Sequence, residues 1–68
     1  MNKIGLEVFA NSMVKLKNVH LIYVEDDIKS IEQRMQNSDE EITLTIASRI
    51  RDITISVKKA DIQNVQKK

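Results

Sequence analysis

The chain has 68 residues, a formal net charge of +1, one histidine, one glycine, and no cysteine or proline. The lack of cysteine excludes disulfides and thiolate metal sites, and a single histidine cannot build a histidine-based metal site within one chain. No apolar run approaches the roughly 20 residues of a membrane span, and no basic-then-apolar leader opens the chain. We therefore expect one small cytoplasmic domain over residues 1–68, without metal, cofactor or membrane contact.

A chain of this length buries only about 60% of the surface that its unfolded form exposes, so its core stabilises it marginally. Small domains compensate with disulfides, a metal or self-association. The composition removes the first two, which leads us to expect a homo-oligomer.

Charge is unevenly distributed. Residues 25–41 carry seven acidic side chains against two basic ones, whereas residues 42–68 carry six basic side chains against two acidic ones. This pattern has two interpretations. It is either ordinary solvated surface, or a basic face that contacts phosphates while the acidic segment is turned away.

The N-terminal third favours extended structure. Alternating apolar residues predict a strand over residues 3–9, followed by a turn at residues 10–12. Residues 13–24 predict a long extended stretch with a break or bulge at Lys17-Asn18. Its second half is apolar on both faces, which is typical of a central strand. We assign His20, on that half, a structural role.

A helix is predicted over residues 28–37. Asp27 is a suitable N-cap, and Ile28, Ile31 and Met35 form a narrow apolar stripe that would cover one face of a sheet. The tail after Lys58 has two interpretations, a helical turn capped by Asp61 or a short edge strand. A 34-residue internal echo between the two halves of the chain would favour the helical turn.

The clearest pattern is a hairpin. Residues 42–46 and 53–57 each alternate apolar side chains with Thr or Ser, which is the period of a half-buried strand. The short gap between them predicts an antiparallel pair with Arg49 and Arg51 at its tip. Together the elements predict an α+β fold, a four-stranded, mainly antiparallel sheet with one helix on a face (ββαββ) and an optional C-terminal helical turn.

The sequence argues against catalysis. No nucleophile arrangement can be assembled around one histidine, and one glycine cannot form a phosphate-binding loop. The carboxylate pairs Asp26-Asp27 and Glu40-Glu41 stand where capping and solvation explain them. Only two side chains, Phe9 and Tyr23, are aromatic, which is too few for a platform that stacks single-stranded bases. We therefore expect a non-enzymatic binding protein.

Candidate binding residues are two pairs of cations. Arg49 and Arg51 are two positions apart at the hairpin tip, where paired guanidinium groups suit duplex phosphates or guanine edges. Lys15 and Lys17 are paired in the same manner on the second predicted strand. One copy would bind weakly, whereas an oligomer that repeats the tip would gain by avidity.

The order of elements resembles the RemA-like regulators of extracellular matrix genes. The similarity rests on Ile4-Gly5-Leu6, Asn11-Ser12-Met13-Val14, the helix from Ile31 to Met35, Ser48-Arg49-Ile50-Arg51, the strand from Ile53 to Val57, and Asp61-Ile62. The resemblance implies a LytTR-like DNA-binding fold, ring-forming subunits and a DNA-contacting role for Arg49 and Arg51. The family has a further arginine near the start of its second strand, and Lys17 falls close to that position in this chain.

Two principal hypotheses follow. The first is an oligomeric transcriptional regulator that contacts duplex DNA through the arginine-bearing tip. The second is a small protein-interaction or structural module, such as a phage or mobile-element accessory protein that binds a host protein. An RNA-binding small barrel is a third alternative.

Overall fold

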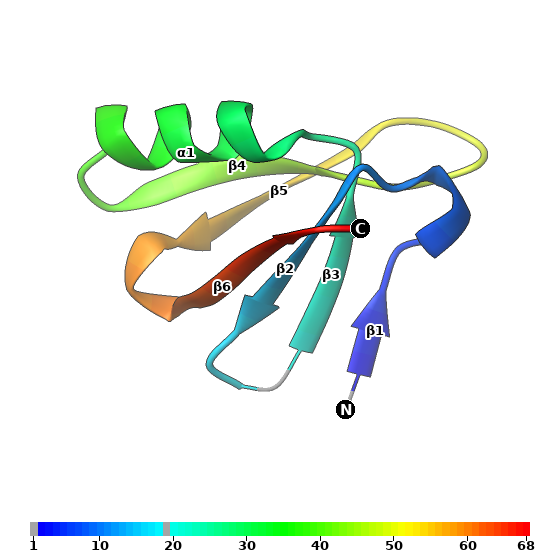
Figure 1. Cartoon of the computed structure of the whole chain (residues 1–68), viewed down its shortest axis with the longest axis horizontal. Coiled ribbons are helices and arrows are strands. Elements are labelled where there is room, and N and C mark those ends of the chain that lie inside the picture. The colour runs from blue at the N-terminus through cyan, green and yellow to red at the C-terminus, as the bar shows by residue number, and fades with distance from the viewer. Residues whose placement is uncertain (1, 19) are drawn as a thin grey trace.

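A computed structural model describes residues 2–18 and 20–68 of the chain. Within them the fold is α+β, with one helix and a six-stranded, mostly antiparallel sheet (Figure 1). The elements in chain order are β1 (Asn2–Ile4), the 3₁₀ turn η1 (Glu7–Phe9), β2 (Ser12–Leu16), β3 (His20–Val24), α1 (Ile28–Asn37), β4 (Glu41–Ile46), β5 (Ile53–Lys58), the 3₁₀ turn η2 (Lys59–Asp61) and β6 (Ile62–Lys67).

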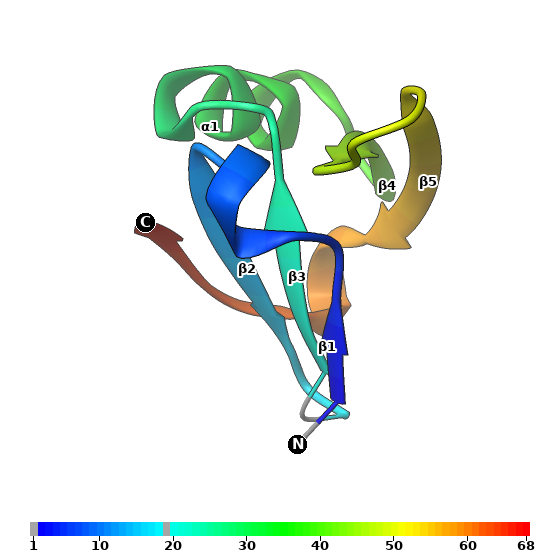
Figure 2. The ribbon, with the colours of Figure 1, turned by 90° about the vertical axis from the view of Figure 1, so that its right-hand side faces the viewer.

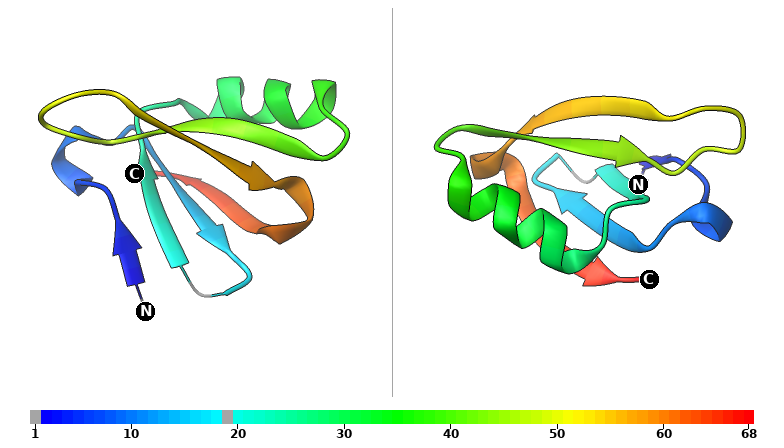
Figure 3. Two further views of the ribbon diagram at one scale, coloured as in Figure 1. Left: turned by 180° about the vertical axis from the view of Figure 1, so that it is seen from behind. Right: turned by 90° about the horizontal axis from the view of Figure 1, so that it is seen from above.

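The sheet is curled. Its hydrogen-bonded strands follow the order β5-β4-β3-β2-β6, and β1 joins β3 in parallel. β5 and β6 stand at opposite ends of this order, yet the three-residue turn η2 joins them. A flat sheet would hold these strands about 19 Å apart at roughly 4.8 Å per strand, whereas such a connection reaches at most about 14 Å. The sheet must therefore bend round, as Figures 2 and 3 show.

The main core lies on one face of the sheet, which we call the inner face. Helix α1 packs against β4 and β6 and buries Ile31 completely in this core. The buried side chains are Val14, Leu16, Ile22, Val24, Ile31, Ile42 and Leu44. The apolar stripe of α1 thus covers the sheet, as its spacing predicts.

A smaller cluster lies on the opposite, outer face. It consists of Ala10, Tyr23 and Ala47, with Met13 and Leu21 packed against it. The N-terminal segment provides Ala10, which means that this segment covers part of the outer face. β3 therefore contributes buried side chains to both faces, which confirms its prediction as a central strand.

The hairpin and the helix are confirmed. β4 and β5 pair in antiparallel register from Ile42↔Val57 to Ile46↔Ile53. α1 begins directly after Asp27, whose Oδ1 accepts a hydrogen bond from the Ser30 backbone N–H at 2.8 Å. Both elements have strong local signals, strict alternation in one and a capped apolar stripe in the other.

The prediction of one extended stretch over residues 13–24 is wrong in its continuity, whereas its break at Lys17-Asn18 is confirmed. β2 and β3 are separate strands that pair in antiparallel register from Ser12↔Val24 to Lys15↔Leu21. The chain reverses at Lys17-Asn18, where Asn18 Oδ1 accepts a hydrogen bond from the His20 backbone N–H at 3.4 Å. Such a side-chain contact supports a turn without glycine or proline. Val19, which the prediction included, lies outside the described residues.

The strand predicted over residues 3–9 is correct only as far as Ile4. Gly5 has φ +92°, a conformation that ends the extended run, and Glu7–Phe9 form η1 instead. Glycine is the residue that adopts this conformation without steric cost. The alternation of Leu6 and Val8 therefore does not reflect a buried strand face, and both side chains are exposed.

The tail forms an edge strand, and its helical alternative is wrong. β6 pairs antiparallel with β2, with a register shift between Lys15 and Leu16. A few residues of isolated helix are unstable in water, whereas β2 offers a free edge for a full strand. The predicted similarity between the two halves of the chain is also wrong. Asp27 precedes a helix, whereas Asp61 precedes a strand. The predicted four-stranded sheet accordingly has six strands.

Candidate functional site

The loop between β4 and β5 has a fixed base and an exposed tip. At the base, the Ala47 side chain is buried, its N–H donates to Tyr23 O at 2.9 Å, and its carbonyl accepts from Leu6 N–H at 2.9 Å. At the tip, Arg49, Ile50 and Arg51 are all exposed, and Ile50 is 89% accessible. The tip thus carries an exposed isoleucine that is flanked in the sequence by two exposed arginines.

The N-terminal segment adds apolar groups beside this loop. The Leu6–Ala47 hydrogen bond places the segment next to the loop base, and both project from the same end of the sheet (Figures 1 and 2). Val8 is 73% exposed, and Leu6 and Phe9 are also exposed. We define the end surface as Leu6, Val8, Phe9, Arg49, Ile50 and Arg51.

The charges at this end are balanced. Glu7 in η1 and Asp52 after the tip are exposed, and their carboxylates offset the two arginines of the end surface. A phosphate-binding surface gains affinity from an excess of cations, which this end lacks. Its exposed aliphatic and aromatic side chains with nearby arginines are instead typical of protein-binding surfaces.

Lys15 and Lys17 lie away from the two arginines. Ser12, at the start of β2, pairs with Val24, which in turn pairs with Ile46 near the arginine loop. Lys17 follows the other end of β2, about 17 Å along an extended strand, and its N–H donates to Asp61 O. The structure therefore does not bring the four predicted cations together on one face.

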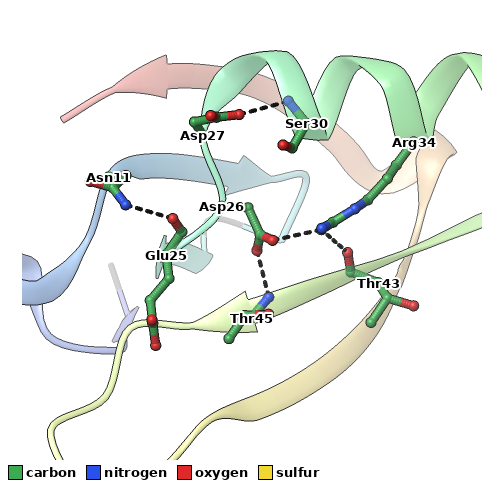
Figure 4. A network of polar contacts seen from close by, with 8 residues as sticks. All are labelled: Asn11, Glu25, Asp26, Asp27, Ser30, Arg34, Thr43 and Thr45. Carbon is green, nitrogen blue, oxygen red and sulfur yellow. Dashed lines mark hydrogen bonds and ion pairs between the residues drawn. The ribbon is translucent and has the colours of Figure 1, made fainter.

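A polar network links α1 to the sheet (Figure 4). Asp26 Oδ1 lies 2.7 Å from Arg34 Nη1, and Asp26 Oδ2 accepts a hydrogen bond from Thr45 N–H at 2.6 Å. The Arg34 guanidinium also donates to Thr43 O at 2.8 Å. Asp26 has a side chain only 7% exposed and joins the β3–α1 connection to β4. This arrangement serves the fold and presents no free carboxylate for catalysis.

The neighbouring Asp27 is the exposed N-cap. Its hydrogen bond from the Ser30 backbone N–H lowers the pKa of the Asp27 carboxyl below the ordinary value, because the bond favours the charged form. The sequence predicts capping for this pair of residues, but it does not predict the ion pair between Asp26 and Arg34. An acidic residue directly before an N-cap gives no local sign that it will pair with an arginine eight positions later.

The remaining surface offers little further chemistry. One open depression, of about 510 Å³, lies along α1 and β4. A second, of about 630 Å³, is lined by Asn11, Asp27, Ile28, Lys29 and Lys67. Among residues 2–18 and 20–68, no group of three or more His, Asp or Glu side chains is placed to hold a metal ion. In the same residues, no helix has the length and apolar character to cross a membrane. His20 is partly buried, in keeping with a structural role.

The end surface was only partly visible in the sequence. The exposed arginines follow from the hairpin prediction, but Leu6 and Val8 fall within the strand predicted over residues 3–9. Two local signals pointed elsewhere, the single glycine at Gly5 and an isoleucine in the middle of a polar tip. Comparison of the chain with family models, curated proteins and solved structures finds no match.

Proposed function

We propose that this protein is a non-enzymatic interaction module that binds a partner protein through the end surface. The observation that carries the proposal is Ile50, an isoleucine 89% exposed at the tip of a loop whose base is fixed by backbone hydrogen bonds. Exposed aliphatic groups gain free energy when a partner buries them, at about 25 cal/mol per Å² of apolar surface. Because the base of the loop is fixed, the loop loses less conformational entropy on binding than a free segment would.

The chemistry of the end surface describes its partner. Ile50, Val8 and Phe9 fit an apolar pocket, and Arg49 and Arg51 fit carboxylates at the rim of such a pocket. Arginine beside apolar groups is common among the residues that dominate binding energy. The expected partner is therefore a protein surface with a hydrophobic depression flanked by Asp or Glu.

Site-specific photo-crosslinking in the native host can test this proposal. A photoreactive phenylalanine analogue at Ile50 should crosslink a defined host protein, whereas the same analogue at Gln63, exposed on β6, should not. With that protein purified, Ile50→Ser should weaken binding at least about tenfold, because a central apolar anchor is lost. Calorimetry measures the affinity, and Gln63→Ser is the matched control. Equal crosslinking at both positions, or an affinity unchanged by Ile50→Ser, contradicts the proposal.

Duplex DNA binding is the second candidate, favoured by the state of the two tip arginines. Among residues 2–18 and 20–68, neither Arg49 nor Arg51 takes part in a salt bridge, so both guanidinium groups are available to phosphates. The resemblance to RemA-like regulators implies a DNA-contacting role for the same two residues. Two phosphate contacts per copy would give weak, strongly salt-dependent binding.

Fluorescence anisotropy with a labelled duplex at low salt separates this candidate from the first. Arg49→Ala combined with Arg51→Ala should abolish binding, because these side chains supply the phosphate contacts. For the unmodified protein, the logarithm of the binding constant should fall with the logarithm of the salt concentration with a slope of about −1.8 per copy, and this dependence should disappear in the double variant. Lys15→Ala combined with Lys17→Ala is the matched control with the same charge change at a distant site. If the arginine pair and the lysine pair have the same effect, the tip is not a DNA-binding site.

A further inference from the structure

β5 forms an open edge of the sheet. It ends the strand order, and β4 is its only partner strand among the described residues. Thr43 and Thr45 direct their carbonyls away from β5, to Arg34 and to Glu25 N–H, so Ile42, Leu44 and Ile46 provide the bonds to β5. Because backbone direction alternates along an antiparallel pair, the outward N–H and C=O groups of β5 belong to Thr54 and Ser56.

Over five of its six residues this edge lacks the features by which proteins prevent strands from pairing with other chains, and Lys58 at its end is its one charged residue. Between Ile53 and Val57 it has no charge, proline or glycine, every apolar residue is β-branched, and Ile53 is 39% exposed. The other long edge, β6, also carries one lysine, Lys67, but it is polar at Gln63, Asn64 and Gln66 as well and pairs with β2 through a register shift. Charges, bulges and short strands commonly protect edges, so β5 is the edge suited to recruit another strand.

We propose that β5 binds β5 of a second copy in antiparallel orientation, with the twofold axis at Ile55. This inference does not depend on the function proposed for the end surface. In this register Thr54 lies opposite Ser56 of the partner copy, so their outward backbone groups form a pair of hydrogen bonds on each side of the axis. The same pairing places Ile53 opposite Val57 of the partner, and Ile55 opposite its own copy.

Charge complementarity selects this register. With the axis at Ile55, Asp52 faces Lys58 of the partner copy, and the symmetry repeats this pair at the other end of the strand. An axis at Thr54 or at Ser56 also places side chains of the same sheet face opposite one another. In those registers, however, Asp52 no longer lies opposite Lys58 of the partner copy. Opposite charges across an antiparallel ladder are favourable, and like charges are unfavourable. Asp52 and Lys58 are both exposed and therefore available for this contact.

An interface of this kind closes at two copies, because each copy uses the same strand. The paired strands run in opposite directions, so the two arginine loops point to opposite ends of the dimer. One six-residue edge buries less than the roughly 800 Å² per partner of a standard interface. We therefore expect a dissociation constant in the micromolar range, visible as a concentration-dependent mass by sedimentation velocity.

Charge-reversal variants of the whole chain test the register. Asp52→Lys alone, or Lys58→Asp alone, should weaken the homodimer about tenfold or more, because each change turns both opposite-charge pairs into like-charge pairs. Asp52→Lys combined with Lys58→Asp should restore it. An equimolar mixture of the two single variants should form a heterodimer, detected by native mass spectrometry, since every facing pair is then complementary.

Circular dichroism should show that each variant keeps the wild-type fold, as both positions are exposed. Lys67→Asp on β6 is the matched control and should leave the dimer unchanged. A wild-type chain that is monomeric at several hundred micromolar would overturn the proposal. So would single reversals without effect, a mixture that forms no heterodimer, or a dimer lost in the Lys67→Asp variant.

Discussion

Replacement of Asp26 by alanine is expected to lower the free energy of unfolding by about 2 kcal/mol. The Asp26 carboxylate pairs with Arg34 and accepts the Thr45 N–H bond, and its side chain is 7% exposed (Figure 4). Its removal leaves a partly buried backbone donor without a partner, which costs roughly 1–3 kcal/mol. It also releases Arg34, although that guanidinium is partly exposed and regains water.

Urea unfolding measures this effect, with Asp39→Ala, an exposed carboxylate after α1, as the control. A domain of this size has only about 3–10 kcal/mol of stability in total, so a loss of this size should lower the unfolding midpoint clearly. Asp26→Asn keeps the size of the side chain and one acceptor, and it should cost less. If Asp26→Ala and Asp39→Ala have equal midpoints, the network does not stabilise the fold.

Replacement of Gly5 by alanine is expected to cost about 2–4 kcal/mol and to detach the N-terminal segment from the sheet. Gly5 has φ +92°, and an added Cβ would lie 2.6 Å from Tyr23 O and 3.3 Å from Ala47 O. Both oxygens belong to the backbone of the sheet region and cannot rotate away. The segment must therefore move, which would break the Leu6–Ala47 hydrogen bond and uncover Tyr23.

Two measurements detect this change. Tyr23 is the only tyrosine and the chain has no tryptophan, so fluorescence quenching by acrylamide reports the exposure of that one ring. Hydrogen exchange of the Leu6 amide reports whether its bond to Ala47 remains. Glu7→Ala, an exposed change in the same segment, is the control. A protected Leu6 amide and an unchanged unfolding midpoint in the Gly5 variant would show that the contact of residue 5 with the Tyr23 and Ala47 carbonyls tolerates a side chain.

The Gly5 variant also bears on the end surface, because it removes Leu6, Val8 and Phe9 from their place beside the arginine loop. Partner binding should then weaken even though Ile50 and the two arginines are untouched. The β5 edge starts next to the arginine tip, at Ile53, but the Gly5 variant changes no residue of it, so its self-association is expected to persist wherever the variant stays folded. The two proposed surfaces can thus be examined independently.

The sequence by itself determined the elements whose signals are local. Strict alternation specified the β4–β5 hairpin and its exposed arginine tip, and Asp27 with the stripe of Ile28, Ile31 and Met35 specified α1. These signals suffice because turn, cap and side-chain period act within a few residues of one another.

Only the tertiary structure decided the features that depend on distant partners. The tail is a strand because β2 offers an edge to it, and Asp26 is buried because Arg34 and Thr45 meet it. Leu6 and Val8 alternate as strand residues do, yet the chain turns at Gly5, where its backbone passes close to the Tyr23 and Ala47 carbonyls, and both side chains are exposed. In each case the stabilising contact lies far along the chain, and a local pattern contains no information about which distant group will supply it.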